Sequence, residues 1–363
     1  MYPRVIIHLQ KLQENAARLV GFLAEKGIQT VAVTKVFGAD PRILKAYYDG
    51  GIRHFADARI QNLARISPAY GSRMLLRIPM QSELQQVITH ADISLQSDIH
   101  TIRKLNEEAK RQDKTHQILL MIDLGDLREG VYERGEMREM AKEIASLSHI
   151  DWIGTGTNLT CYGGVLPTKE NLTQLLETTR WLREETGLSL PVISAGNSSS
   201  LYLTEEEGWP EGLNQLRIGE ALALGTEAAY GRPFLHLHTD CFELEAEIVE
   251  SRVKPSMPIG TIGKNAFGET PVFEDKGDRL RAIVAVGRQD ADAADLVLQS
   301  PCMQILGASS DHMILDAGSC ANAQLVEVGK TLRFWMNYRA VLRAFTSEYV
   351  DRYYEEPNDE RTN

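Results

Sequence analysis

Lys35 stands at the point where an apolar run of the sequence meets a turn. In "TVAVTKVFGADP" residues 31–33 form the short apolar run of a buried parallel strand, which ends on Lys35, before a glycine and the Asp40-Pro41 start of a helix. A lysine held at the buried end of a strand is partly desolvated, so its amine can form a Schiff base with a carbonyl compound. The alternative is a lysine that merely extends from the strand end to solvent.

Residues 194–200, "SAGNSSS", have the composition of a phosphate-binding turn. Backbone N–H groups, hydroxyls and a helix N-terminus can together bind a dianion, although a serine-rich helix cap would show the same composition. A second turn of small residues, "RIGEA", begins at Arg217. A phosphate site near a Schiff-base lysine indicates pyridoxal phosphate as the cofactor, and this pairing favours the catalytic interpretation of Lys35.

Short apolar runs alternate with helical patterns through the first two thirds of the chain, which predicts a TIM-like (β/α)8 barrel over residues 1–235. A doubly wound sheet is the competing fold, but its G-x-G-x-x-G turn after the first strand is missing. Because such barrels carry catalytic groups at the carboxyl ends of their strands, Lys35, "SAGNSSS" and Arg217 would meet at one mouth. The predicted strands lie in "TVAVTK", "IRHFA", "MLLRI", "DISL", "QILLMID", "DWIGTGT", "PVIS" and "QLRIG".

The pattern changes near residue 236. In "CFELEAEIVE" apolar residues alternate strictly with glutamates, which is typical of a strand with one buried and one solvated face. Further strands are predicted at "RAIVAVG", "MQILGA", "HMILDA" and "TLRFWMNY". The sequence therefore predicts a mainly-β C-terminal domain over residues 236–363.

Composition narrows the kind of partner. The 363 residues are 43% hydrophobic and 25% charged, which is ordinary for a globular protein. The formal net charge of -11 argues against binding to nucleic acid or to an anionic membrane, because no basic stripe is available to release phosphate counterions. The predicted partner is a small molecule.

The cysteines and the N-terminus point to a reducing compartment. The four cysteines lie far apart without metal-ligand spacing, so neither a zinc site nor a disulfide framework is predicted. His236 and His238 lack a third ligand, and no metal is predicted. No signal peptide is recognised, and no apolar run approaches the roughly 18 residues of a membrane span, so a cytoplasmic location is expected. The cysteines are Cys161, Cys241, Cys302 and Cys320.

These motifs resemble those of the alanine racemase superfamily of fold-type III pyridoxal phosphate enzymes, and within it the alanine/ornithine racemase-like group, over nearly the whole chain. "AVTKVFG" resembles the family's lysine-bearing first strand, so the resemblance implies that Lys35 holds the cofactor. "MIDLGDLREGV" resembles the segment whose arginine, here Arg128, lies near the cofactor and the substrate carboxylate.

Three further segments resemble cofactor-binding segments of the family. "SAGNSSSLYL" is similar to its phosphate loop, and "LRIGEALALG" to the strand whose arginine, here Arg217, meets the pyridine nitrogen. "MNYRAVLRA" is similar to the segment whose tyrosine, here Tyr338, reaches the phosphate. The cofactor-binding residues so implied are Lys35, Arg128, Asn158, Asn197, Ser198, Ser199, Arg217, Gly219, Glu220 and Tyr338.

The chain departs from the family at the second catalytic base. The family takes a tyrosine from the partner's β domain in a head-to-tail homodimer with shared active sites, but none occurs around "MPIGTIGKNAFG". Arg288 of "GRQDA" stands where another tyrosine is expected, and "GASSDHM" leaves Asp311 and His312 in place of a Met-Asp loop. His312 and Asp311 are therefore the candidates for the second base. Lys264 and Asp290 are weaker candidates for the base, and Arg128, Arg288 and Ser310 are candidates for binding the substrate.

The resemblance implies an amino acid racemase that moves the α-proton between two bases, with ornithine, lysine or alanine as its substrate. Asp126 and Glu220 are acids that could meet a distal ammonium group or could be solvated loop acids. A decarboxylase or aldolase of the same architecture is one alternative, and a non-catalytic carrier of the cofactor is another. Arg217 counts against the decarboxylase, and the C-terminal β domain counts against the carrier.

Overall fold

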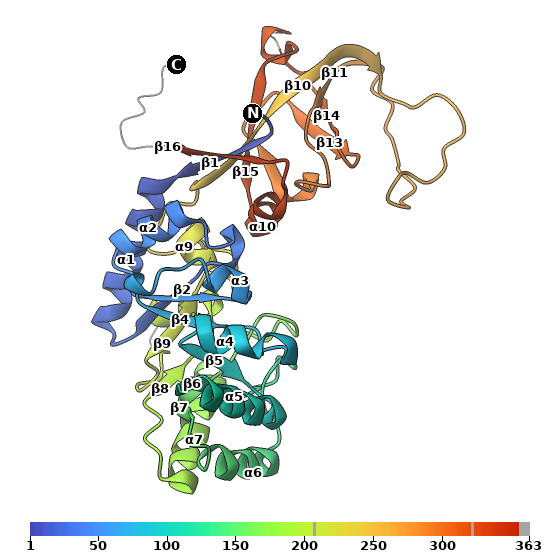
Figure 1. The fold of residues 1–363 in the computed structure, drawn as a ribbon. Helices are drawn as coiled ribbons and strands as arrows, with labels where there is room; N and C mark the ends of the chain where they lie inside the picture. Colours follow the sequence, from blue (N-terminus) through green and yellow to red (C-terminus); the bar gives the residue numbers. More distant parts are fainter. Residues whose placement is uncertain (206–207, 321–322, 356–363) are drawn as a thin grey trace. The chain divides into compact units, whose positions relative to one another are not determined.

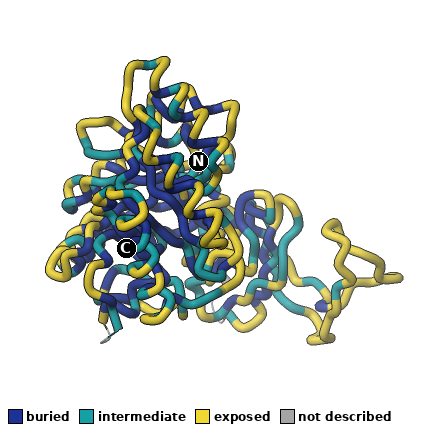
Figure 2. Tube along the Cα trace, turned by 90° about the horizontal axis from the view of Figure 1, so that it is seen from below, coloured by how far each residue is buried: buried dark blue, intermediate teal, exposed yellow. Residues whose placement is uncertain are grey.

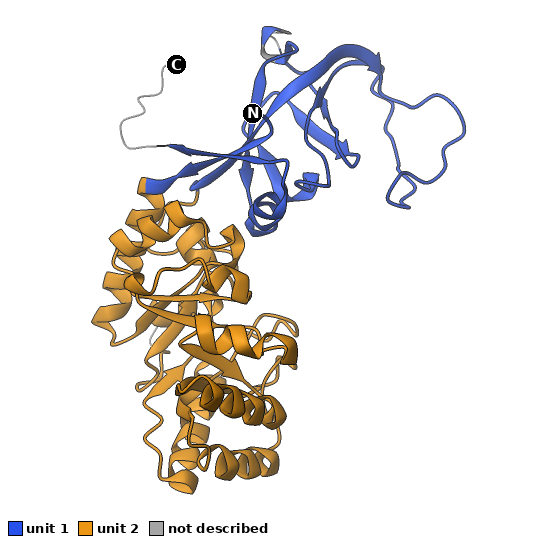
Figure 3. Ribbon diagram, in the orientation of Figure 1, with its two compact units in different colours: residues 1–9, 240–363 blue, residues 10–239 orange. Residues whose placement is uncertain are grey.

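The structure is a computed structural model that describes residues 1–205, 208–320 and 323–355. The chain divides into two compact units, distinguished by colour in Figure 3. Residues Gln10–Thr239 form the barrel unit, and Met1–Leu9 together with Asp240–Asn363 form the β unit. The first nine residues differ from the sequence analysis, which placed them with the barrel, because β1 (Arg4–His8) pairs with β10 (Phe242–Pro255) and β16 (Asp351–Glu355) of the β unit.

Among the described residues, the barrel unit contains eight parallel strands in a closed barrel (Figure 1), which confirms the predicted (β/α)8 architecture. The ring closes where β2 pairs with β9 and Gln29 lies opposite Gln215. Gly154 permits the close approach of two neighbouring strands, since a Cβ atom there would lie 1.8 Å from the carbonyl oxygen of Val192. The strands are β2 (Gln29–Val33), β3 (His54–Asp57), β4 (Ser72–Leu75), β5 (Ile93–Gln96), β6 (His116–Met121), β7 (Ile150–Gly156), β8 (Val192–Ser194) and β9 (Gln215–Ile218).

Aliphatic and methionine side chains fill part of the barrel, and helices follow the strands. Val31 and Val33 alternate along β2 into one buried cluster with Met74, Leu119 and Met121. This is the pattern expected of parallel strands that are buried on both faces. The helices are α1 (Leu9–Glu25), α2 (Pro41–Asp49), α3 (Ile60–Leu63), α4 (Leu84–His90), α5 (Ile99–Arg111), α6 (Arg134–Ile144), α7 (Lys169–Thr186), α8 (Tyr202–Glu205) and α9 (Glu220–Leu224).

The β unit is built on a mainly antiparallel sheet, as predicted. Its strand order is β12-β15-β10-β11-β14-β13, with β1 pairing to β10 and β16 pairing to β1. Figure 2 shows exposed trace along the protruding connection between β10 and β11, where Ile259 and Val272 are exposed. The elements are β10 (Phe242–Pro255), β11 (Asp278–Val284), β12 (Leu296–Leu298), β13 (Gln304–Ala308), β14 (Met313–Asp316), β15 (Thr331–Met336), α10 (Tyr338–Thr346) and β16 (Asp351–Glu355).

The glutamates of β10 do not form a solvated face, contrary to the prediction from their alternation. Glu243 and Glu245 are only 2% and 4% exposed. The flanking strands β1 and β15 cover them with basic side chains: Arg4 and Arg333 contact Glu245, and His8 lies 2.8 Å from Glu243. Burial raises the pKa of Glu243, but hydrogen bonds from His8 and Gln299 outweigh it and lower this pKa to about 2.

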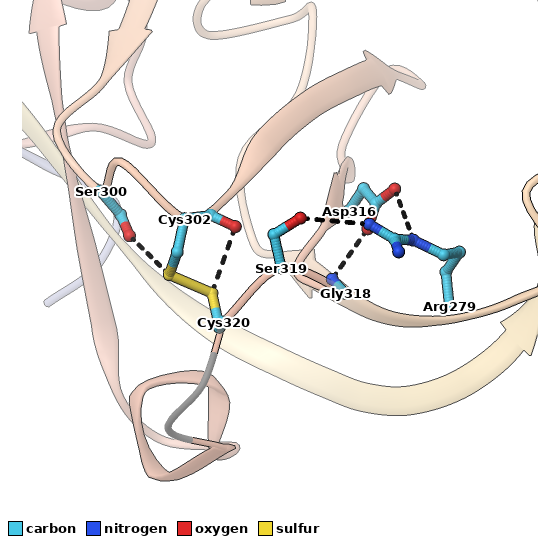
Figure 4. The surroundings of a disulfide bond; sticks show 7 residues. All are labelled: Arg279, Ser300, Cys302, Asp316, Gly318, Ser319 and Cys320. Carbon is cyan, nitrogen blue, oxygen red and sulfur yellow. Dashed lines mark hydrogen bonds and ion pairs between the residues drawn. A yellow bond between two sulfur atoms is a disulfide. The ribbon is translucent and has the colours of Figure 1, made fainter.

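Cys302 and Cys320 form a disulfide, which the sequence analysis did not predict (Figure 4). The two residues are 18 positions apart, one before β13 and one after β14, and the antiparallel pairing of these strands brings their Cα atoms within 5.0 Å. The expectation of no disulfide was wrong because it rested on spacing, whereas the pairing depends on this hairpin. In the same region Arg279 pairs with Asp316 at 3.2 Å.

None of the helices in the described ranges is long and apolar enough to cross a membrane. The same residues contain no group of three or more histidine, cysteine or acidic side chains that could hold a metal ion. His238 instead pairs with Glu14 of α1 at 2.7 Å, and the carbonyl of His236 accepts a hydrogen bond from Arg18 at 2.6 Å. Both residues therefore contact the first helix of the barrel unit, His238 through its ring and the exposed His236 through its backbone carbonyl.

Candidate active site

Lys35 begins a short 3-10 helix, Lys35–Phe37, directly after the first barrel strand. The strand itself ends at Val33, two residues earlier than the apolar run indicated. The difference arises because Thr34 adopts a helical backbone conformation, with φ -97° and ψ -3°. Its N–H still donates to the carbonyl of Ala56 at 2.8 Å, and its hydroxyl donates to Asp57 at 2.7 Å. Gly38 closes the turn with φ 60°, a backbone conformation that favours glycine. Lys35 is thus held by a turn that is fixed on both sides. The residue is exposed, however, so the partial desolvation expected of it was wrong, because Lys35 lies in the turn beyond the buried strand.

Asp57 is a buried carboxylate that joins the ends of β2 and β3. It accepts hydrogen bonds from the hydroxyl of Thr34, from the backbone N–H of Arg59 at 2.9 Å and from the side chain of Asn62 at 3.0 Å. Burial raises its pKa, although these hydrogen bonds oppose the rise. Asp57 therefore anchors the turn that carries Lys35.

Arg217 lies inside the barrel on β9 and is only 2% exposed. Its guanidinium donates to the hydroxyl of Ser194, to the carbonyl of Thr157 and, at 2.8 Å, to the side-chain oxygen of Asn158. Among the described residues no carboxylate contacts it directly. Burial accordingly lowers the pKa of Arg217 to about 10.

The "SAGNSSS" segment folds as a 3-10 turn, Ser198–Ser200, capped by Asn197. The side-chain oxygen of Asn197 accepts from the N–H of Ser199 at 2.8 Å. The hydroxyl oxygen of Ser198 accepts from the N–H groups of Gly219 and Ala221, each at 3.3 Å. The structure therefore brings the two predicted phosphate-binding turns together. Glu220 lies within the second of these turns, and burial raises its pKa.

Arg128, Glu129 and Asn158 form a polar cluster beside Arg217. The guanidinium of Arg128 donates through Nε and Nη2 to the two oxygens of Glu129, and Asn158 donates to Glu129 through Nδ2. Asn158 in turn accepts from Arg217. Sequence reasoning predicted Arg128, Asn158 and Arg217 but missed Glu129. The available signal was an acid directly following the predicted arginine in "DLREG".

Asp126 does not face solvent and is not open to a substrate ammonium group. It is 1% exposed and accepts hydrogen bonds from the N–H groups of Cys161, Tyr162 and Val165 at 3.1, 2.9 and 3.1 Å. Burial opposes ionisation, but these backbone hydrogen bonds outweigh it and lower the pKa of Asp126. Asp126 therefore ties the loop after β6 to the loop after β7.

The remaining predicted residues lie in the β unit. The N–H of Arg288 donates to the carbonyl of Ser309 at 2.9 Å, and Asp311 and His312 are exposed on the adjoining turn between β13 and β14. The Arg288 side chain pairs with Glu269 at 3.2 Å and stacks over the ring of Phe267. Ser310 lies on the same turn as His312, and Tyr338 is the first residue of α10. The structure thus groups Arg288, Ser310, Asp311 and His312.

Comparison with known proteins places the chain in a family. Residues 7–227 match the alanine racemase N-terminal domain. The chain is 44% identical over 352 residues to an ornithine racemase from Acetoanaerobium sticklandii, covering 97% of this chain and 99% of that protein. It is 39% identical over 357 residues to a lysine racemase from Thermotoga maritima, covering 98% and 99% of the two chains.

Solved structures share the fold of the whole chain. An alanine racemase from Streptomyces lavendulae matches with a TM-score of 0.77 at 17% identity, covering 98% of both chains. An alanine racemase from Bartonella henselae, solved with covalently bound pyridoxal phosphate, matches with a TM-score of 0.74 at 17% identity, covering 97% of this chain and 99% of that one. These likenesses show the barrel-plus-β architecture alone.

The chain belongs to the alanine racemase family, as its motifs indicated. It is a pyridoxal phosphate-dependent amino acid racemase. The residues of the barrel mouth fit the cofactor's charge and its phosphate. Ser199 and Thr157 are fully buried, and their hydroxyl oxygens have no hydrogen-bond partner among the described residues. Gly219 has no side chain to crowd the second turn, where a Cβ atom would lie 3.3 Å from Val33.

Proposed function

We propose that this racemase interconverts the L- and D-forms of an amino acid with a cationic side chain, ornithine or lysine, ahead of alanine. The observation that carries the proposal is the similarity of nearly the full chain to both an ornithine racemase and a lysine racemase. Asp126 is occupied by backbone N–H groups, so Glu220 is the remaining predicted acid for the distal ammonium group.

The barrel mouth would hold the cofactor through three kinds of group. Lys35 would attach it. Asn197, Ser198 and Ser199 would bind its phosphate from one turn and the backbone of Gly219 and Glu220 from the other, which leaves the Glu220 side chain for the substrate. Tyr338 would complete the phosphate-binding set. Arg217 would donate to the pyridine nitrogen. Because an arginine donates without giving up its proton, it limits the electron withdrawal by the ring and so restrains decarboxylation and transamination.

When bound, the cofactor withdraws electrons from the substrate's α-carbon and so makes its proton acidic. Lys35 would remove or return this proton on one face, and a second base would do so on the other face. His312 is our candidate for that base, with Asp311 beside it, supplied by the β unit of the partner in a head-to-tail homodimer. Arg128 would orient the substrate carboxylate, with Arg288 and Ser310 as further contacts.

The cytoplasmic location stays a prediction, which cell fractionation would test.

The substrate is tested by incubating the enzyme in heavy water with a panel of L-amino acids and following α-proton exchange by NMR. We expect the highest kcat/KM for exchange with ornithine or lysine, and a lower value for alanine. A preference for alanine or for an acidic amino acid would contradict the proposed substrate class and leave the racemase activity in place.

The shared active site is tested by subunit exchange between Lys35→Ala and His312→Ala proteins, each inactive alone. If the two bases come from different protomers, about half of the dimers are heterodimers, each with one intact site. Mixing should then restore up to roughly a quarter of the wild-type activity. No recovery after proven exchange would show that the bases share one chain or that His312 is not the second base.

A further inference from the structure

Arg128 and Arg217 lie in the same polar cluster, and one carboxylate is placed to compensate both. Arg217 is buried and has no carboxylate against it, and Asp126 is taken up by backbone N–H groups. Glu129, whose side chain is 16% exposed, contacts Arg128 directly and reaches Arg217 through Asn158. Its charge also raises the pKa of Arg217, against the stronger effect of burial.

The contact between Arg128 and Glu129 sets the orientation of the guanidinium plane and places a negative charge beside it. Two N–H groups of the guanidinium meet the two carboxylate oxygens, so the planar fork of Arg128 is set in one orientation. Its Nη1 has no contact with Glu129. A side chain that already holds a ligand-binding group in one orientation reduces the conformational entropy that is lost when the ligand binds.

The loop that carries Glu129 is itself held at both ends. At its base the N–H of Val131 donates to the carbonyl of Met121 at 2.8 Å, and the side chain of Asp123 accepts from the N–H groups of Gly125 and Leu127. A Cβ atom at Gly130 would lie 2.5 Å from the N–H nitrogen of Asp123, so the chain next to Glu129 passes close to the strand end. The Glu129 carboxylate is thus presented by a constrained segment.

We propose that Glu129 is a positioning residue of the racemase, which aligns Arg128 for the substrate carboxylate and, through Asn158, shares its charge with Arg217. The inference rests on the roles given to Arg128 and Arg217 under the proposed function. Glu129 touches neither the substrate nor the cofactor in this account, and it acts through the two arginines.

Glu129→Gln keeps the shape of the side chain and removes its charge. We expect kcat/KM to fall about tenfold in Glu129→Gln, because the fork of Arg128 loses its partner. In an Arg128→Ala background the same substitution should change kcat/KM less than about twofold, since the group it acts through is already gone. Glu139→Gln removes an exposed carboxylate of α6 and is the matched control, which should leave kcat/KM unchanged.

The visible absorption of the bound cofactor distinguishes the effect of the Glu129 charge from the effect of Glu129 on the orientation of Arg128. Removing a negative charge makes nearby acids easier to deprotonate, so the pH midpoint of the bound cofactor's visible absorption band should fall by about half a unit in Glu129→Gln. Glu129→Asp keeps the charge but shortens the reach, so it should keep the midpoint and still lose activity. Thermal unfolding of the protein freed of cofactor should be the same for Glu129→Gln and Glu139→Gln.

Two results would overturn this proposal and leave the proposed function in place. In the first, Glu129→Gln has the same kcat/KM and the same pH midpoint as Glu139→Gln. In the second, Glu129→Gln lowers kcat/KM by the same factor in the wild type and in the Arg128→Ala background. The second would mean that Glu129 merely supports the fold. An unchanged kcat/KM in Arg128→Ala would overturn the proposed role of Arg128 together with this inference.

Discussion

Buried charged side chains have different kinds of partner in the β unit and in the barrel mouth, the end of the barrel at the carboxyl ends of its strands. In the β unit, Glu243 and Glu245 meet His8, Arg4 and Arg333 directly. In the barrel mouth, Arg217 is equally buried but contacts hydroxyl, carbonyl and amide oxygens in place of a carboxylate, and Asp57 is held by neutral donors. The β unit pairs its buried carboxylates with basic side chains, whereas Arg217 in the barrel mouth has neutral acceptors, which suits its proposed role toward the cofactor.

This difference separates charge that stabilises the fold from charge kept for chemistry. Removing one member of a buried ion pair leaves its partner uncompensated, so the β unit should respond chiefly by losing stability. Removing Arg217 from the barrel mouth should chiefly change the reaction, because we propose that its positive charge acts on the bound cofactor.

The largest effect is expected at Arg217. Arg217→Glu should lower racemisation by about a thousandfold and raise the yield of pyridoxamine phosphate, because a carboxyl partner would favour a protonated pyridine nitrogen. Chromatography of the released cofactor measures this side reaction, with Arg217→Lys as the charge-preserving control. If pyridoxamine phosphate stays constant while the cofactor remains bound, Arg217 is not the partner of the ring nitrogen.

Glu243 should matter for stability. We expect Glu243→Gln to lower the free energy of unfolding by about 3 kcal/mol at pH 7, with the exposed Glu274→Gln as the control. Since the folded-state pKa of Glu243 is about 2 and its ordinary value is 4.5, its contribution is present above pH 4.5 and is lost as the pH falls toward 2. Urea unfolding at several pH values measures both effects, and equal stability of the two variants at pH 7 would refute the pairing.

In the barrel unit, His116 should make a smaller contribution to the pH dependence of the free energy of unfolding. Its ring nitrogen lies 2.8 Å from the hydroxyl of Ser94, and burial lowers its pKa from 6.5 to about 4. The unfolded chain therefore binds a proton more readily, and stability is lost as the pH falls from 6.5 to 4. Over this window the wild type should lose about 2 kcal/mol more unfolding free energy than His116→Gln. Parallel pH profiles would show that His116 is not buried in its neutral form.

The same contrast explains what the sequence could predict. The barrel could be predicted from local patterns, because strands buried on both faces are apolar runs between helices. The prediction differs from the structure at strand ends, as at Lys35, which lies beyond the end of its strand. The burial of Glu243 could not be predicted in this way, since the partner that covers it, His8, is 235 residues away in sequence. Alternation gives the period of a strand but not what lies against each face.

In the candidate site, the strand-end residues and their meeting at one end of the barrel could be predicted, but the contacts between side chains of neighbouring loops could not. Lys35, Arg217 and the turn at Ser198 were identified from strand ends and small-residue composition. Glu129 was not predicted because its contacts are with Arg128 and Asn158, which belong to loops after different strands. Asp126 shows the converse, since an acid near the mouth is fully used by backbone N–H groups.

The central claim is that the barrel mouth holds the cofactor through Lys35, and locating the attachment tests it most directly. The purified enzyme is reduced with borohydride, digested, and analysed by mass spectrometry for the peptide that carries the reduced cofactor. The account predicts this mass on Lys35 in the wild type and its loss in Lys35→Ala, with the exposed Lys45→Ala as a control that retains it. A cofactor mass on another lysine of the wild type, or one retained by Lys35→Ala, would contradict the account.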